Sequence, residues 1–303
     1  GPMTTQYGYD RLYRLVRTVY PPELTGLGAP WGNQTHEWIY DAIGNRKAQV
    51  IYDNTTGDPI GKQVYTYNLK DVGPHLVSVS AGDTEVTYAY DANGNLVLKT
   101  DGATKLETEY TWDMDDRMTE SWTEGMTSGT YSVYAYNGAR LFRRVATSLF
   151  AVSTTYLYDR EDILRASRDG GPTHLTHGPG IDDALAAQGG TGVSYLYKNL
   201  LGSVLQETRA GQVTRRTSYD AWGTASPWPS AMVQNVPYAY TGSEWDDRGV
   251  YYYRNRFYTP EVGRFISVDP LVRKLWFLAS YHRHTSSIGL MPYVYVGQRP
   301  IGL

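Results

Sequence analysis

The chain has 303 residues, with 28 basic and 31 acidic side chains, a net charge of −3 and no cysteine. The lack of cysteine excludes disulfides and thiolate metal sites, and the interspersed charges argue against the basic face of a nucleic-acid-binding protein. No run of about 18 apolar residues is present, so we expect no membrane-spanning segment. We also expect no cofactor, and the first residues lack the pattern of a signal peptide.

Tyrosine is the most informative residue type, because the chain holds 28 Tyr against 5 Phe, together with 31 Gly. Aromatic rings pack well on the pleated surface of a strand, and glycine supplies the turns between strands. The composition therefore predicts an all-β fold. Helical spacing of apolar residues is confined to two short windows, 182–188 and 271–281.

An aromatic residue followed by Asp or Asn recurs along the chain. From Tyr67 onward most steps between these pairs are 22 to 24 residues, and one step is 39. In the unit at Tyr197 a lysine takes the place of the acidic residue. Such a period predicts a repeat architecture, in which each unit packs against its neighbours. The pairs begin at Tyr9, Tyr40, Tyr67, Tyr90, Trp112, Tyr136, Tyr158, Tyr197 and Tyr219.

The unit around Tyr90 shows how one repeat folds. Tyr88 and Tyr90 are two positions apart, so their rings point to the same face of a strand. Asp91 can cap backbone amides of the following turn, where Gly94 tolerates a positive φ. A unit of this length gives two strands and two turns, and one hairpin cannot bury its own apolar face. We therefore predict that residues 4–173 form repeated antiparallel hairpins in a curved, spiralling sheet. In each Tyr-Asp pair we expect the Tyr to pack on the sheet and the Asp to hold a turn.

The later part of the chain carries more specific motifs. Residues 177–182 (HGPGID), 195–223 and 251–270 (YYYRNRFYTPEVGRFISVDP) are similar to blocks of the Rhs or YD-repeat family, and we assign residues 174–303 to its Rhs-associated core. The resemblance implies a β-sheet shell, or cocoon, with the core plugging one end. In many members the core cuts the chain, and the released C-terminal piece is often a toxin.

This resemblance implies a structural module of a bacterial polymorphic-toxin or cell-surface system. Such a module is exported, and it shields, presents or delivers an attached C-terminal segment. About nine repeats are fewer than a full shell needs, so we expect a partial shell. Its open sheet edge could pair with another copy of the chain.

A hydrolase that cleaves itself at the core, or that acts on an external substrate, is a further hypothesis. The self-cleavage that the resemblance implies gives this hypothesis its candidate residues. Arg264 and Asp269 match the family block beside the cut. Hydrolysis needs one carboxyl group as general base and another as general acid. The chain has no second carboxylate before Gly302 to match the family's terminal motif. The alternative is that Arg264 pairs with a carboxylate and Asp269 shapes the Asp-Pro turn.

A glycan-binding or adhesion module is the competing hypothesis. Tryptophans in Gly- and Pro-rich segments could stack on a sugar face, or could instead cover a sheet edge. The candidates are Trp31, Trp38, Trp222 and Trp228. Two histidine pairs lack a nearby acidic cluster, so we predict no metal site at either. These pairs are His174 with His177, and His282 with His284.

Overall fold

The structure is a computed structural model that describes residues 4–68, 74–123, 130–137, 140–147, 151–168, 171–226, 236–246, 249–271 and 293. Strands make up most of it, which confirms the all-β prediction. Its 3-10 helices, η1 (Pro22–Leu27) and η3 (Tyr240–Gly242), are short. No helix within these ranges is long and apolar enough to cross a membrane. The helix expected over 271–281 lies outside the described residues beyond Leu271.

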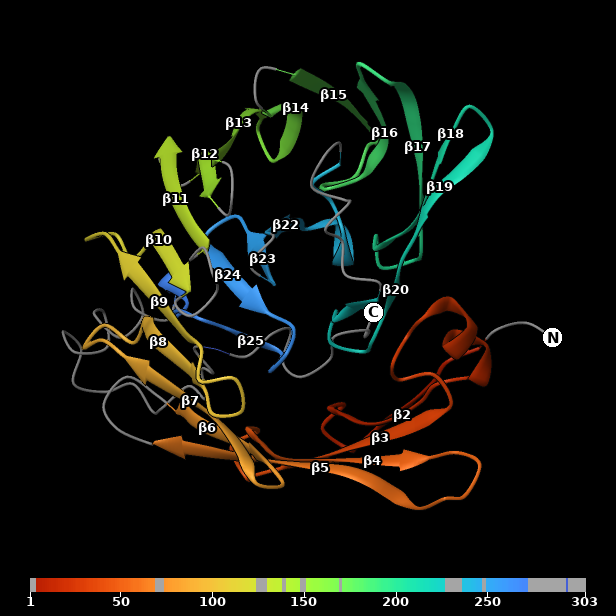
Figure 1. The fold of residues 1–303 in the computed structure, drawn as a ribbon, viewed down its shortest axis with the longest axis vertical. Helices are drawn as coiled ribbons and strands as arrows, with labels where there is room; N and C mark the ends of the chain where they lie inside the picture. Colours follow the sequence, from red (N-terminus) through yellow and green to blue (C-terminus); the bar gives the residue numbers. More distant parts are fainter. Residues whose placement is uncertain are drawn as a thin grey trace.

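A single 19-stranded sheet forms the body of the molecule. Each strand pairs antiparallel with the next strand along the chain. Figure 1 shows that this meander curves around the centre of the molecule. The strands are β1 (Gln6–Tyr9), β2 (Leu15–Val19), β3 (Gln34–Tyr40), β4 (Arg46–Asp53), β5 (Pro59–Asn68), β6 (His75–Ala81), β7 (Thr84–Tyr90), β8 (Leu96–Asp101), β9 (Glu107–Trp112), β10 (Met118–Thr123), β11 (Thr130–Asn137), β12 (Arg140–Thr147), β13 (Ala151–Asp159), β14 (Asp162–Arg168), β15 (Gly171–His177), β16 (Ala184–Gly189), β17 (Gly192–Lys198), β18 (Val204–Arg209) and β19 (Gln212–Arg216).

A second, four-stranded sheet lies inside this curve (Figure 1). We call it the inner sheet. A two-stranded ribbon precedes it along the chain, so the polypeptide turns inward after β19. The ribbon consists of β20 (Ser218–Tyr219) and β21 (Ala225–Ser226), and the inner sheet of β22 (Glu244–Asp246), β23 (Val250–Tyr253), β24 (Arg256–Thr259) and β25 (Arg264–Phe265).

The two sheets share one hydrophobic core. Buried side chains from β5 to β18 contribute to it, and the inner sheet contributes Tyr252 and Phe257. The ring of Tyr134 in β11 meets that of Phe257 edge-on at 5.3 Å between centroids. Tyr88 is buried and Tyr90 packs against the same cluster, as their spacing predicts. Side chains of both sheets therefore pack against each other in the space beside the inner sheet.

The predicted capping role of the repeat aspartates is confirmed at Asp91. Its N–H donates to the carbonyl of Asn95 at 2.9 Å, and Gly94 donates to the carbonyl of Asp91 at 3.0 Å. The Asp91 Oδ1 accepts the N–H of Asn95 at 2.8 Å. Gly94 has a φ of 81°, which a residue with a side chain adopts only with strain. Turns with the same backbone bonds begin at Asp10, Asp41, Asp113, Asn199 and Asp220.

The hydroxyl or indole N–H group of each of these repeat aromatics donates a hydrogen bond to a backbone carbonyl of the preceding repeat. The Tyr136 hydroxyl donates to the carbonyl of Met118 at 2.6 Å, and the indole N–H of Trp112 donates to that of Leu96 at 2.7 Å. Each acceptor is the first residue after a repeat turn, at the buried start of a strand. Phenylalanine could not make this bond, which gives a reason for tyrosine at these positions. Tyr40 and Tyr219 bond to Leu15 and Val204 in the same way.

Two sequence predictions of local structure are wrong. The short helix expected over 182–188 is instead β16, which pairs with both β15 and β17. Sheet pairing on both sides therefore overrides the local preference of its alanines for helix. The repeat aligned on Tyr197 is shifted by one residue, because its turn begins at Asn199. Leu196 therefore points inward, and Tyr195 and Tyr197 are 57% and 53% exposed.

The predicted division at residues 173 and 174 falls within a strand, β15. The assignment of two domains stays a prediction. At the sheet margins β1 pairs with β2 and β19 with β18. Pairing of such an edge with a second copy of the chain also stays a prediction.

Candidate functional site

Asp269 lies where the chain leaves the inner sheet. Its Oδ2 forms an ion pair with Arg256 Nη2 at 2.9 Å, and its Oδ1 accepts the N–H of Leu271 at 2.9 Å. The Arg256 guanidinium also lies 3.5 Å from the centroid of the Phe265 ring. Burial lowers the pKa of Arg256 to about 10, and the Asp269 carboxylate opposes that shift. Asp269 is thus both an ion-pair partner and the cap of the Asp-Pro turn.

Arg264 lies at the start of β25 and is 3% exposed. Its Nη2 donates to the carbonyl of Pro74 at 2.9 Å, and its guanidinium lies 5.1 Å from the centroid of the Tyr67 ring. Within the described ranges no ion pair or hydrogen bond joins Arg264 to Asp269. Carboxylate pairing therefore involves Arg256 and not Arg264. The cleavage role assigned to Arg264 and Asp269 stays a prediction.

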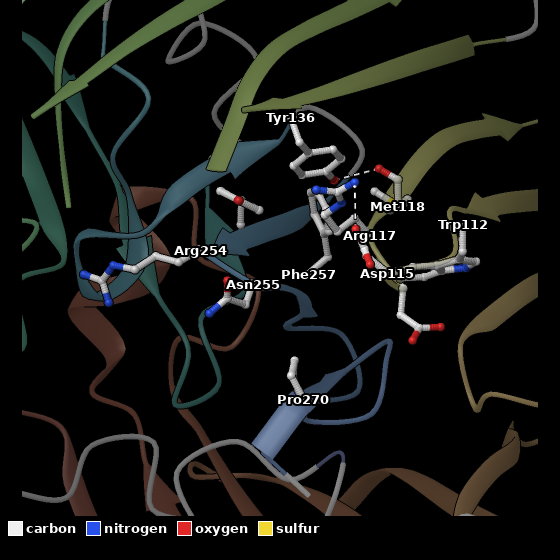
Figure 2. A pocket seen from close by; sticks show the side chains of 11 residues that line it. Trp112, Asp115, Arg117, Met118, Tyr136, Arg254, Asn255, Phe257 and Pro270 are labelled. Carbon is white, nitrogen blue, oxygen red and sulfur yellow. Dashed lines mark hydrogen bonds and ion pairs between the residues drawn. The ribbon is translucent and has the colours of Figure 1, made fainter. Parts of the chain in front are cut away.

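A cavity of about 410 Å³ lies beside Pro270 (Figure 2). One wall is the turn that follows β9, and the opposite wall is the hairpin of β23 and β24. Arg117 on the first wall pairs with Asp113 at 2.7 Å and lies over the ring of Tyr136. The residues around it are Trp112, Asp115, Asp116, Arg117, Met118, Tyr136, Tyr252, Arg254, Asn255, Phe257 and Pro270. The chain therefore passes a partly acidic cavity directly after Asp269.

The tryptophans proposed for sugar stacking are buried where they are described. Trp31, Trp38 and Trp222 are 4%, 3% and 2% exposed. The rings of Trp38 and Trp222 pack edge-on at 5.9 Å, and the guanidinium of Arg46 lies 4.4 Å from the Trp222 ring. These three rings pack within the protein and offer no open face to a ligand. Trp228 lies outside the described residues.

The side chains of His174 and His177 on β15 do not point toward a common site. His177 Nε2 lies 3.3 Å from the Tyr238 hydroxyl, and His174 is exposed. Their three-residue spacing places them on opposite faces of the strand. Throughout the described part of the chain no group of three or more His, Asp or Glu is placed to hold a metal ion. His282 and His284 lie outside it.

A second cavity, of about 330 Å³, was not predicted from the sequence. We call it the inner cavity. It lies between the inner faces of β3 to β9 and the segments that follow β20 and β24, and its polar wall includes His36, Gln49, Tyr88 and Asp220. Burial lowers the pKa of His36 to about 4 and raises that of Asp220 to about 6. The sequence differs here in one respect: among the repeat turns that begin with Asp, this one ends in Thr224, whereas the others end in Arg or Asn.

The fold thus consists of a curved antiparallel sheet with a smaller sheet inside the curve, and the two cavities lie between them. No family model matches the chain. It is 27% identical over 242 residues to the tRNA3(Ser)-specific nuclease WapA of Bacillus spizizenii, an alignment that covers 77% of this chain and 10% of the relative. It is 24% identical over 330 residues to double-stranded DNA deaminase toxin A of Burkholderia cenocepacia, covering 89% of this chain and 23% of that protein.

A solved structure of the Photorhabdus luminescens Tc holotoxin pore matches with 17% identity and a TM-score of 0.48, covering 99% of this chain and 18% of that one. The chain thus spans about a tenth of the WapA relative and less than a quarter of the deaminase toxin. The sequence similarities to the WapA nuclease and to the deaminase toxin support the interpretation that this chain is a module of a toxin system.

Proposed function

We propose that this chain is the plugged section of a β-sheet shell in a longer, exported bacterial toxin, and that it shields or presents a segment attached to it. The observation that carries the proposal is the single core shared by strands β5 to β18 and the inner sheet. Because this core joins the inner sheet to the curved sheet, we expect the attached segment to be held beyond the plug rather than between the two sheets.

Buried polar contacts support the role of the inner sheet as a plug. The Tyr134 hydroxyl donates to Asp246 Oδ2 at 2.8 Å, and the Tyr158 hydroxyl lies 2.9 Å and 3.1 Å from the two carboxylate oxygens of Glu244. Asp246 and Glu244 are 3% and 8% exposed. A buried carboxylate that lacks hydrogen-bond donors destabilises the folded protein. These bonds therefore favour one position of β22 against β11 and β13.

Limited proteolysis of the full-length gene product tests the shielding role. We expect the attached segment to be digested more slowly in the full-length protein than when it is expressed alone. A Tyr134→Phe, Tyr158→Phe double variant should speed its digestion, because both donors to the buried carboxylates of β22 are lost. Equal digestion rates for the attached and the isolated segment would contradict shielding.

Self-cleavage is tested separately, by the intact mass of the full-length product. If Asp269 takes part, the wild-type protein splits downstream of the core and the Asp269→Asn variant stays whole. Asp115→Asn is the matched control, since it removes a carboxylate from the cavity beside Pro270 and leaves the Arg256 ion pair in place. If both the wild-type and the Asp269→Asn proteins stay whole, the cleavage hypothesis fails and the shielding role is unaffected.

A further inference from the structure

The turns of the curved sheet lie at its two ends. Because each strand pairs antiparallel with the next one, successive turns alternate between these ends. The described turns after β1, β3, β7, β9, β13, β15 and β17 lie at one end, which we call the repeat-turn rim. The described turns after β2, β4, β6, β8, β16 and β18 lie at the other end, which we call the opposite rim.

The most exposed large apolar side chains of the described residues gather at the repeat-turn rim. In order of exposed fraction they are Leu200 (100%), Met114 (95%), Leu271 (70%), Tyr13 (67%), Ile181 (65%) and Leu12 (62%). All except Leu271 lie in turns of this rim. Leu271 follows Pro270, which lines the same cavity as Asp115 of the turn after β9 (Figure 2). In the described turns of the opposite rim, the one exposed large apolar side chain is Leu27, at 36%.

The backbone of these turns is fixed within the fold. Asn199 Oδ1 accepts the N–H groups of Leu201 and Ser203, each at 3.0 Å, and Ser203 is fully buried. Leu200 therefore stands at the tip of a turn that is anchored at both ends. The turn that carries Met114 is held by the same kind of bonds. Because the tips are already ordered, binding through them costs little conformational entropy.

The spacing of the exposed side chains favours a lipid surface over a protein partner. Neighbouring turns of one rim are two strands apart, which is about 10 Å, so the apolar tips stand singly along the curve. A protein partner is usually held by a contiguous apolar centre. The boundary between headgroups and acyl chains of a membrane is fluid and can accept each side chain separately. Tyrosine, as at Tyr13, is also enriched at the interface of membrane and water.

The charges of the repeat-turn rim favour neutral lipid over anionic lipid. Acidic side chains outnumber basic ones in its described turns. Two of the basic residues already pair with acids: Arg14 with Asp10 at 2.7 Å, and Arg117 with Asp113 at 2.7 Å. An anionic membrane surface attracts clusters of Lys and Arg, and these turns do not supply such a cluster.

We propose that the repeat-turn rim binds the surface of a neutral phospholipid membrane, into which Leu12, Met114, Ile181 and Leu200 insert. The tips reach the acyl boundary, and the polar turns stay among the headgroups. Each inserted side chain strengthens binding by about 10-fold or more, because apolar area leaves water. This attachment is independent of the shielding role, which concerns a segment joined to the chain.

Co-sedimentation of the 303-residue chain with phosphatidylcholine vesicles tests the proposal. We expect the bound fraction to rise to saturation, with half of the protein bound at about 1 mM lipid or less. Because the attraction is apolar, raising the salt concentration from about 0.1 M to about 0.5 M should not weaken binding.

A Met114→Ser, Leu200→Ser double variant should weaken vesicle binding at least ~10-fold, because two of the inserted side chains are lost. Both side chains lie in solvent, so the variant should unfold at the same urea concentration as the wild type. The matched control is Ile60→Ser. Ile60 is 54% exposed at the start of β5, beside the opposite rim, and its loss should leave binding unchanged.

A fluorescent label tests which end of the molecule meets the lipid. Because the chain has no cysteine, Leu200→Cys or Ile60→Cys gives a single site for a nitrobenzoxadiazole dye. With vesicles, the dye at position 200 should brighten and shift to the blue as it leaves water, and the dye at position 60 should not change. An equal response at both positions would overturn the proposal.

Three other results would also overturn it. The first is no binding to phosphatidylcholine vesicles up to about 5 mM lipid, or equal binding of the double variant and the wild type. The second is binding only after phosphatidylglycerol is added, which would indicate electrostatic attachment. The third is a dimer without vesicle binding that the double variant loses, which would make this rim an interface between copies of the chain. Slower digestion of the attached segment, which tests shielding, is unaffected by any of these results.

Discussion

At the scale of single residues, Asp220 links the inner cavity to stability. Burial raises its pKa from 3.8 to about 6, so the folded state holds its proton more tightly than the unfolded state does. The stabilisation from this proton is complete below the unfolded pKa and is lost as pH rises through about 6. At neutral pH the ionised Asp220 carboxylate therefore lowers the free energy of unfolding of the ligand-free protein.

We predict that Asp220→Asn stabilises the ligand-free protein by about 1–2 kcal/mol at pH 8, with the gain vanishing near pH 4. Urea unfolding at both pH values measures it. Asp91→Asn makes the same chemical change in a turn outside the cavity and corrects for any effect on the turn itself. A gain that is equal at both pH values would show that the Asp220 charge is not its cause.

The hydroxyl of a repeat tyrosine gives a second prediction. Tyr136→Phe leaves the ring in place but deprives the Met118 carbonyl of its donor at 2.6 Å. We expect a loss of about 1–2 kcal/mol in the free energy of unfolding, measured by urea denaturation. Tyr195→Phe is the control, since that side chain is 57% exposed, and it should change stability by less than about 0.5 kcal/mol. Equal effects of the two changes would contradict the bonding role.

At the scale of elements, the register of β17 can be tested directly. Leu196 is 7% exposed and belongs to the shared core, whereas its neighbour Tyr195 points outward. Leu196→Ala should therefore lower the free energy of unfolding by about 2–4 kcal/mol, and Tyr195→Ala by less than about 1 kcal/mol. The reverse order in thermal or urea unfolding would support the register that the sequence alignment on Tyr197 predicted.

The sequence predicts the repeat well because its signals are local. Aromatics two positions apart fix one face of a strand, and Asp91 with Gly94 fixes a turn within five residues. The register error at Tyr197 arose because both tyrosines of β17 lie on its outer face, where the other repeats place their tyrosines inward, so the turn residue Asn199 was the better guide. Local patterns also failed for β16, whose conformation depends on its neighbours in the sheet.

The candidate sites were harder to predict because they depend on contacts between distant segments. Asp269 pairs with Arg256, on a strand whose position only the fold reveals. Trp31, Trp38 and Trp222 are buried within the protein. Tyr88 and Asp220 both line the inner cavity, although they are far apart in the sequence. Nothing in the sequence near either residue indicates the other.

At the scale of the whole molecule, the curved sheet and the inner sheet should behave as one cooperative unit. Within the large sheet each strand pairs with its neighbours along the chain, as in other repeat proteins. The inner sheet adds contacts across the curve, because Phe257 packs on Tyr134 and the shared core extends from β5 to β18. Loss of these contacts should therefore weaken strands that are distant from Phe257 in the sequence.

We predict that Phe257→Ala lowers the free energy of unfolding by about 3–5 kcal/mol and reduces amide exchange protection in β10 to β14 as well as in β24. Hydrogen exchange followed by mass spectrometry measures both regions. The control is Ile60→Ala, on a side chain of β5 that is 54% exposed, which should leave protection in β10 to β14 unchanged. If Phe257→Ala weakens only the inner sheet, the plug is an independent unit that can leave the shell without opening it. If both regions lose protection together, the inner sheet cannot separate from the curved sheet without opening it, because one core holds both.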